Sequence, residues 1–161
     1  MVSRTVKAWL PVVAMCVVIF LFSQDANSGR HSQDVLGWLL SLVGMDTHHR
    51  VYQLDGPFRK CAHVLVYFIL GALTYRGFSM GQRRFSGRAA WRALVFSALY
   101  AASDEYHQRF IPGRGPSPRD VMLDTSAAVL ALVVLWLWMR GRSEDGHPRA
   151  VADRGAVTRH G

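Results

Sequence analysis

Residues 103–120, with the sequence SDEYHQRFIPGRGPSPRD, bring ionisable side chains together between two strongly apolar segments. In a helix, Asp104, His107 and Gln108 would share one face, because side chains three and four positions apart are neighbours. A carboxylate beside an imidazole can transfer protons near neutral pH, as general acid–base catalysis requires. The sequence has no HExxH or similarly compact spacing of metal ligands. This face therefore predicts an acid–base site or a polar binding site. The binding of one divalent metal is a further alternative, because histidines and carboxylates are also metal ligands, but no compact motif supports it.

A second group of polar residues opens an earlier apolar segment, in RKCAHVLVY at residues 59–67. Arg59, Lys60, His63 and Tyr67 are spaced so that they follow one stripe of a helix. Arg59 and Lys60 can hold an anionic group of a substrate or extend along the helix to lipid headgroups. The spacing leaves both interpretations open.

Proline and glycine in IPGRGPSP, residues 111–118, separate two helices, because both residues interrupt helical structure. Ser117, Pro118 and Asp120 fit the N-cap, first and third positions of the helix that follows. Asp124 comes one turn after Asp120 on the same face. Asp120 is therefore either a capping residue or a member of a site.

Three further charges in the same stretch have two interpretations each. Arg114 lies between two glycines, and its planar guanidinium can hold a phosphate or carboxylate of a ligand or contact a lipid headgroup. Glu105 and Arg109 adjoin the predicted face and are interpreted as solvated surface charges. Glu105 is nevertheless kept among the acid–base residues because it neighbours Asp104.

The elements that would position these residues are helices. A helix needs roughly 20 predominantly apolar residues to span a membrane, and four segments approach or reach that length with their flanks. They are apolar on all sides, whereas the helices of a soluble bundle show one apolar stripe. We therefore predict an all-α membrane protein with a four-span transmembrane helical bundle. The segments are residues 8–22, 61–75, 89–102 and 121–139.

The orientation follows from the distribution of charge rather than from the net charge of +8. Most Lys and Arg residues lie before residue 8, between residues 76 and 92, and after residue 139. Such an excess marks the cytoplasmic side of a membrane, so both termini and the middle link are predicted inside. The polar stretches are then outside. The basic charge sets topology and contacts anionic lipid, and nucleic acid is not predicted as a partner.

The ends of the chain and the first outer link complete the predicted organisation. Residues 1–140 form the membrane domain, and residues 141–161 form a disordered basic cytoplasmic tail. Residues 32–44, SQDVLGWLLSLVG, predict a short helix capped by Ser32, with Trp38 at the membrane interface. Packing of this helix over the mouth of the bundle is the alternative. Arg4 and Lys7 before the first apolar segment also fit a signal peptide, although its cleavage site is weak.

Three ionisable residues are predicted inside the bundle. His63 and Asp124 lie one turn into their segments, and Asp104 lies at the end of another. An ionisable group at membrane depth is unfavourable unless it faces the interior and pairs with a partner. We therefore expect a contiguous group containing His63, Asp104, His107 and Asp120, with Arg114 at its rim. Such a group either joins the spans or forms a working site.

The motifs RKCAH at residues 59–63, SDEYHQRFIPGR at 103–114 and DVMLD at 120–124 resemble those of the VanZ-like family of small bacterial membrane proteins. The resemblance covers roughly residues 6–139 and includes FSQ at residues 22–24. The family is named for a teicoplanin-resistance protein, which describes a phenotype rather than a reaction. Two positions depart from the family pattern, since Val66 stands where Glu is common and Asp124 where Asn is usual.

Two functions from different classes are consistent with these residues. In the first, the protein acts on an envelope lipid or cell-wall component at the outer face of the plasma membrane, and glycopeptide resistance is a linked outcome. In the second, it is a non-enzymatic module that binds lipid or antibiotic. Transport is disfavoured because the charges lie at one membrane edge, and no cofactor is assigned. The acid–base residues are His63, Asp104, Glu105, His107 and Asp120, and the binding residues are Arg59, Lys60, Gln108, Arg114 and Asp124.

Overall fold

The computed structural model describes residues 3–24, 28–42, 44, 47–82, 84–111 and 117–144. These residues form helices joined by turns and links, and none of them lies in a strand. The prediction of an all-α protein is therefore confirmed for this part of the chain. In order, the helices are α1 (Arg4–Gln24), α2 (Ser28–Leu42), α3 (Thr47–Ser79), α4 (Gly87–Gln108) and α5 (Pro118–Glu144).

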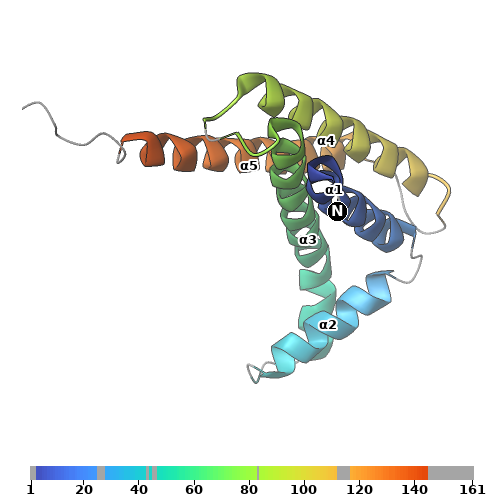
Figure 1. Cartoon of the computed structure of the whole chain (residues 1–161). Coiled ribbons are helices and arrows are strands. Elements are labelled where there is room, and N and C mark those ends of the chain that lie inside the picture. The colour runs from blue at the N-terminus through green and yellow to red at the C-terminus, as the bar shows by residue number, and fades with distance from the viewer. Residues whose placement is uncertain are drawn as a thin grey trace, which may run out of the picture.

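Helix α3 is the centre of the arrangement. Helices α1, α4 and α5 gather around its C-terminal part, whereas α2 packs against its N-terminal part (Figure 1). The link predicted between the first two spans is thus largely helical, because α3 begins at Thr47 and continues past Pro57. Helix α2 begins at Ser28, so the prediction that Ser32 caps it is wrong.

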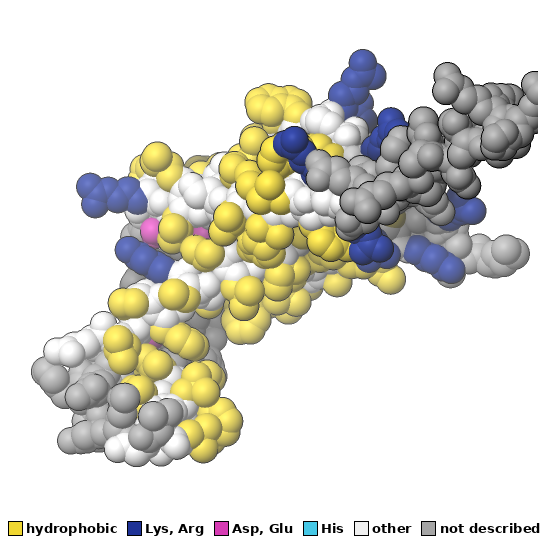
Figure 2. All heavy atoms as spheres, turned by 90° about the vertical axis from the view of Figure 1, so that its left-hand side faces the viewer, with side chains coloured by type: hydrophobic (Ala, Val, Ile, Leu, Met, Phe, Trp, Pro, Cys, Tyr) yellow, Lys and Arg dark blue, Asp and Glu magenta, His cyan; other side chains and the backbone are white. Residues whose placement is uncertain are grey.

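Three of the described helices are long and apolar enough to cross a membrane: Arg4–Gln24, Gln53–Ser79 and Pro118–Arg142. Helix α4 is not among them, because Arg88 and Arg92 near its start and Asp104 and Glu105 near its end interrupt its apolar sequence. Hydrophobic side chains are nevertheless widely exposed over the middle of the face shown in Figure 2. The membrane character of the chain is therefore supported, and the fourth predicted span is not demonstrated.

Small residues allow the close packing of α3 against α5. A Cβ atom added at Gly71 would lie 2.9 Å from the Cα of Ala128, so only glycine fits this contact. Ala127 and Ala131 are also buried at the α5 side. The approach keeps the start of α5 beside the middle of α3, where His63 and Tyr67 lie.

The helix ends that carry most of the basic residues lie together at one end of the bundle. At one end, Trp9 of α1 packs edge-on against Phe78 of α3, with ring centroids 4.9 Å apart, and the Tyr75 hydroxyl contacts Met139 of α5 and the backbone N–H of Ser86. We call this the basic end. In Figure 2, most of the visible Lys and Arg side chains lie in the right-hand half of the picture. The exposed basic residues near this end are Arg4, Lys7, Arg76, Arg84, Arg88, Arg92, Arg140 and Arg142.

Helix α2 buries one side and exposes the other. Leu36 is 7% exposed, whereas Val35, Trp38, Leu39 and Leu42 present an apolar surface outward. A helix with such a surface is suited to the boundary between lipid and water.

Towards the C-terminus, α5 extends to Glu144, beyond Gly141 where the tail was predicted to begin. The rest of that tail lies outside the described residues.

Candidate functional site

Opposite the basic end, the last turns of α4 and the first turns of α5 bring four carboxylates together. Asp104 and Glu105 are 6% and 7% exposed, and Asp124 is 3% exposed. All four, including the half-buried Asp120, are close enough to interact electrostatically. We call Asp104, Glu105, Asp120 and Asp124 the acidic cluster. Burial removes solvating water from these groups, so each needs partners in the protein or a ligand.

One partner is a histidine of α3. The Nδ1 atom of His63 lies 3.4 Å from Oδ2 of Asp124, which confirms the expected carboxylate–histidine pairing between spans. The second oxygen of Asp124, Oδ1, is buried and has no hydrogen-bond partner among the described residues. The fully buried hydroxyl of Tyr67, whose ring stacks on His63, is also without a partner there. The contact between His63 and Asp124 thus joins α3 to α5, while Oδ1 of Asp124 stays without a hydrogen-bond partner among the described residues.

Glu105 connects two helices. Its carboxylate accepts a hydrogen bond from the backbone N–H of Ser117, the residue before α5. A carboxylate at a helix N-terminus stabilises the unpaired N–H groups and the positive end of the dipole. The interpretation of Glu105 as a solvated surface charge is therefore wrong. Helix α5 starts at Pro118 as predicted, and the backbone N–H of Asp120 donates to the Ser117 carbonyl at 2.9 Å.

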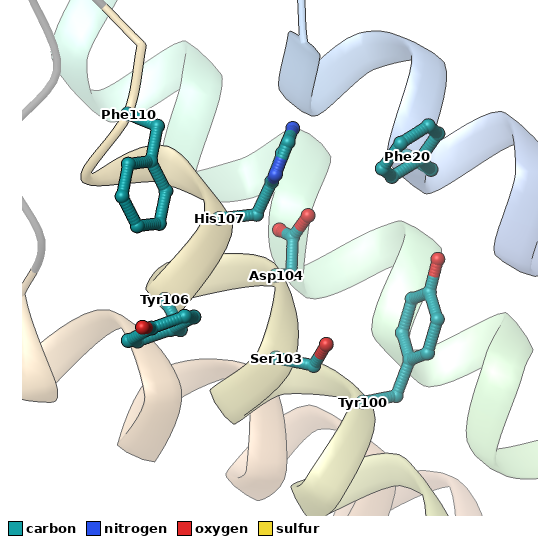
Figure 3. Close-up of a pocket in the computed structure, with 7 residues that line it drawn as sticks. All are labelled: Phe20, Tyr100, Ser103, Asp104, Tyr106, His107 and Phe110. Carbon is teal, nitrogen blue, oxygen red and sulfur yellow. The ribbon is translucent and has the colours of Figure 1, made fainter.

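Beside the acidic cluster, α4 and α1 enclose a pocket of about 230 Å³ (Figure 3). We call it the aromatic pocket. Asp104 and His107 lie in its middle, between rings on either side. The buried Nε2 atom of His107 has no hydrogen-bond partner among the described residues, while its ring lies 5.1 Å from that of Phe20. The lining residues are Phe20, Tyr100, Ser103, Asp104, Tyr106, His107 and Phe110.

The predicted group is therefore largely assembled. Asp104 contributes to both the acidic cluster and the aromatic pocket, and Gln108 donates to its Oδ2 at 3.2 Å. Arg59 is half-buried and Lys60 is exposed on α3, one turn before His63. Arg109 lies over the Tyr106 ring at 5.5 Å rather than in the pocket.

Two further positions bear on the predicted site, Arg114 and Val66. Arg114 was predicted at the rim, and it lies outside the described residues. Val66, where the family commonly has Glu, is partly buried and packs against the core. This chain therefore has an apolar contact, and no acid, at that place.

The sequence interpretation missed the aromatic side of the site. Tyr100 and Ser103 precede His107 by seven and four positions, so helical spacing from His107 would have placed them on the same face. Phe20 could not be found this way, because it comes from α1. The Tyr100 hydroxyl also donates to the Cys16 carbonyl at 2.5 Å, which fixes α1 against α4.

The geometry can hold a polar group or move a proton. His107 and Asp104 both line the pocket (Figure 3), and the buried Nε2 atom of His107 has no hydrogen-bond partner among the described residues. Within the described part of the chain, no three His, Cys, Asp or Glu residues are grouped so as to hold a metal ion. The two cysteines of this region, Cys16 and Cys61, are not bonded to one another.

Comparison with known proteins gives one match. The model of the family described as VanZ/LLP1 matches residues 8–139. No curated protein and no solved structure matches the chain. The matched residues include α3, α4 and most of α5, and with them the acidic cluster and the aromatic pocket. Because the match covers most of its length, the protein belongs to the VanZ/LLP1 family, as its motifs predicted.

Proposed function

We propose that the protein is a multi-pass protein of the bacterial plasma membrane, with four spans and both termini in the cytoplasm. In this proposal α4 is the fourth span, because it packs against both α3 and α5 through residues such as Ala93 and Ala101. The charges at its two ends then lie at the two membrane surfaces. The basic end faces the cytoplasm, as Lys and Arg excess requires, and the aromatic pocket faces outward.

Thiol labelling tests this orientation. In a background with Cys16 and Cys61 replaced by alanine, a cysteine at Gly113 should react with a membrane-impermeant maleimide in intact cells. A cysteine at Gly87, at the start of α4, should react only after permeabilisation. Gly113 lies outside the described residues, but it belongs to the link between α4 and α5. Labelling in the reverse pattern would place the pocket inside the cell and remove the proposal of an outward site.

The function supported best is the binding of the polar part of an envelope amphiphile, such as a lipid or a lipid-linked cell-wall component. The observation that carries it is the aromatic pocket, where the polar side chains of His107 and Asp104 lie among aromatic rings. Binding sites for small ligands are mostly apolar, with a few placed polar groups that fix orientation. Phe20 and Phe110 are more than a third exposed, so the pocket opens toward the surface that lipid would cover.

Acid–base catalysis on the bound molecule is the second candidate. It is favoured by the position of His107 and Asp104 in one pocket, because histidine can exchange a proton near neutral pH. The reaction would be a hydrolysis or a group transfer. Membership of the VanZ/LLP1 family adds the finer proposal that the protein acts on the cell envelope and contributes to glycopeptide resistance, including resistance to teicoplanin. Nucleic acid has no part in this function.

A substitution that fills the pocket tests the binding function. Ser103 is exposed and lines the pocket, so Ser103→Leu should occupy the space of the ligand without disturbing the core. Lipids extracted from the purified protein would be identified by mass spectrometry, and the retained species should decrease several-fold in this variant. Ala102→Leu, at the exposed neighbouring position, is the matched control and should retain them. Equal lipid content in Ser103→Leu and the wild type would contradict the proposal.

A further inference from the structure

We propose that the aromatic pocket selects a cationic headgroup, an alkylammonium borne by an amphiphile. This inference rests on the proposed function and specifies its ligand class. It differs from the expectation that arginine side chains would hold an anionic group. Three observations carry it: the rings that line the pocket, the sign of the buried charge, and the size of the space.

Four aromatic rings besides His107 line the pocket. Phe20 and Tyr100 lie on one side of His107 and Asp104, while Tyr106 and Phe110 lie on the other (Figure 3). Aromatic faces attract ammonium groups, and several rings around one space form the cages that bind choline-like ligands. The Arg109 guanidinium lies over the Tyr106 ring, 5.5 Å from the ring centroid, so this ring already contacts one cation of the protein.

The charge of the residues that line the aromatic pocket also favours a cationic headgroup. Asp104 is 6% exposed and lines the pocket, and Gln108 holds its Oδ2 by a hydrogen bond of 3.2 Å. Glu105 and Asp124 interact electrostatically with Asp104, although they do not line the pocket. Among the described lining residues there is no Lys or Arg. An ammonium in the pocket would pair with the Asp104 carboxylate, whereas a phosphate in the same place would be repelled.

The size of the space suits a small headgroup. The pocket has a volume of about 230 Å³. An alkylammonium with its nearest carbons fits this volume. The acyl chains would continue outside, along exposed apolar side chains of the same two helices, such as Leu21 of α1 and Leu99 of α4.

The test is competitive lipid binding. The full-length protein in maltoside detergent would be given equal amounts of phosphatidylethanolamine and phosphatidylglycerol with identical acyl chains, and adducts counted by native mass spectrometry. We expect the ethanolamine lipid to be retained about tenfold over the glycerol lipid, through cation–π contact and pairing with Asp104. Asp104→Asn and Phe110→Leu should each reduce this ratio toward one.

Matched controls separate the pocket from general effects. Trp91→Leu removes a ring that is 66% exposed near the basic end, against 67% for Phe110. Asp34→Asn removes an exposed carboxylate of α2. Both should keep the wild-type ratio. Because Phe110 is exposed, its variant remains informative even if Asp104→Asn does not fold.

The outcomes distinguish this inference from the function on which it rests. Retention of phosphatidylglycerol over phosphatidylethanolamine, lost in Ser103→Leu, would overturn the cationic specificity and leave amphiphile binding intact. Adducts unaffected by Ser103→Leu and Phe110→Leu would overturn both. Soluble ethanolamine, added as competitor, identifies the source of the ammonium. Displacement of the lipid shows a site for free amines as well, and no displacement shows that the amine must be borne by a lipid; either supports the inference.

Discussion

Replacing His63 by alanine is expected to destabilise the protein by about 3 kcal/mol. Loss of one member of a buried ion pair typically costs ~3–5 kcal/mol, because the other charge stays buried without compensation. The lower end applies here, since the His63 side chain is 31% exposed while that of Asp124 is 4% exposed. Asp124 Oδ1 already has no partner among the described residues, so the whole carboxylate would lose support. Thermal unfolding in detergent, followed by fluorescence size-exclusion, measures the change.

A double-mutant cycle identifies the cause. Asp124→Asn removes the charge but keeps the shape, and asparagine is usual at this place in the family. The double variant His63→Ala with Asp124→Asn should recover part of the loss, with a coupling energy of about 1 kcal/mol or more. Additive effects of the two substitutions would show that the 3.4 Å contact contributes nothing to stability.

If the pocket performs acid–base catalysis, replacing His107 by glutamine is expected to abolish activity without unfolding the protein. Glutamine preserves the length and hydrogen bonding of histidine but cannot exchange a proton near neutral pH. General acid–base catalysis contributes about 10²–10⁴-fold to a rate, and a loss of that size would remove a cellular phenotype. The protein should stay folded, because Nε2 of His107 makes no hydrogen bond within the described residues that glutamine would have to replace. The readout is complementation of a deletion strain, scored by envelope lipid composition and teicoplanin susceptibility.

The control for this substitution is His160→Gln in the C-terminal tail, which should complement fully. A size-exclusion profile must accompany each variant, so that lost expression is not mistaken for lost function. A well-folded His107→Gln protein with full activity would exclude proton transfer at this residue. The pocket would then act by binding alone.

The fold could be predicted where hydrophobicity decides it. The apolar segments of α1, α3 and α5 each identify a helix, and the Gly and Pro residues before Ser117 correctly separate α4 from α5. The extension of α3 to Thr47 could not be predicted in this way. Pro57 and Gly56 indicate a break, but the tertiary contact with α2 through Val51 and Gly37 supports a continuous helix.

The site was predictable only in part, and for a physical reason. A pairing of a histidine with a carboxylate inside the bundle follows from the unfavourable energy of single charges in an apolar setting, but the sequence did not identify Asp124 as the partner of His63. The buried role of Glu105 depends on where the α5 backbone begins in space. The position of Phe20 beside His107 depends on how α1 leans against α4, and neither arrangement has a signal in helical spacing.

The pairing of His63 with Asp124 also has a consequence for biogenesis. In the proposed topology, α3 leaves the ribosome before α5, so His63 would enter the membrane before the segment that carries Asp124. The carboxylate of Asp124 would then find a partner there and would not have to remain in lipid as an isolated charge. Gly71 admits Ala128 at close range, so α5 can pack directly against α3. The helix that carries His63 is therefore synthesised before the helix that carries its partner, Asp124.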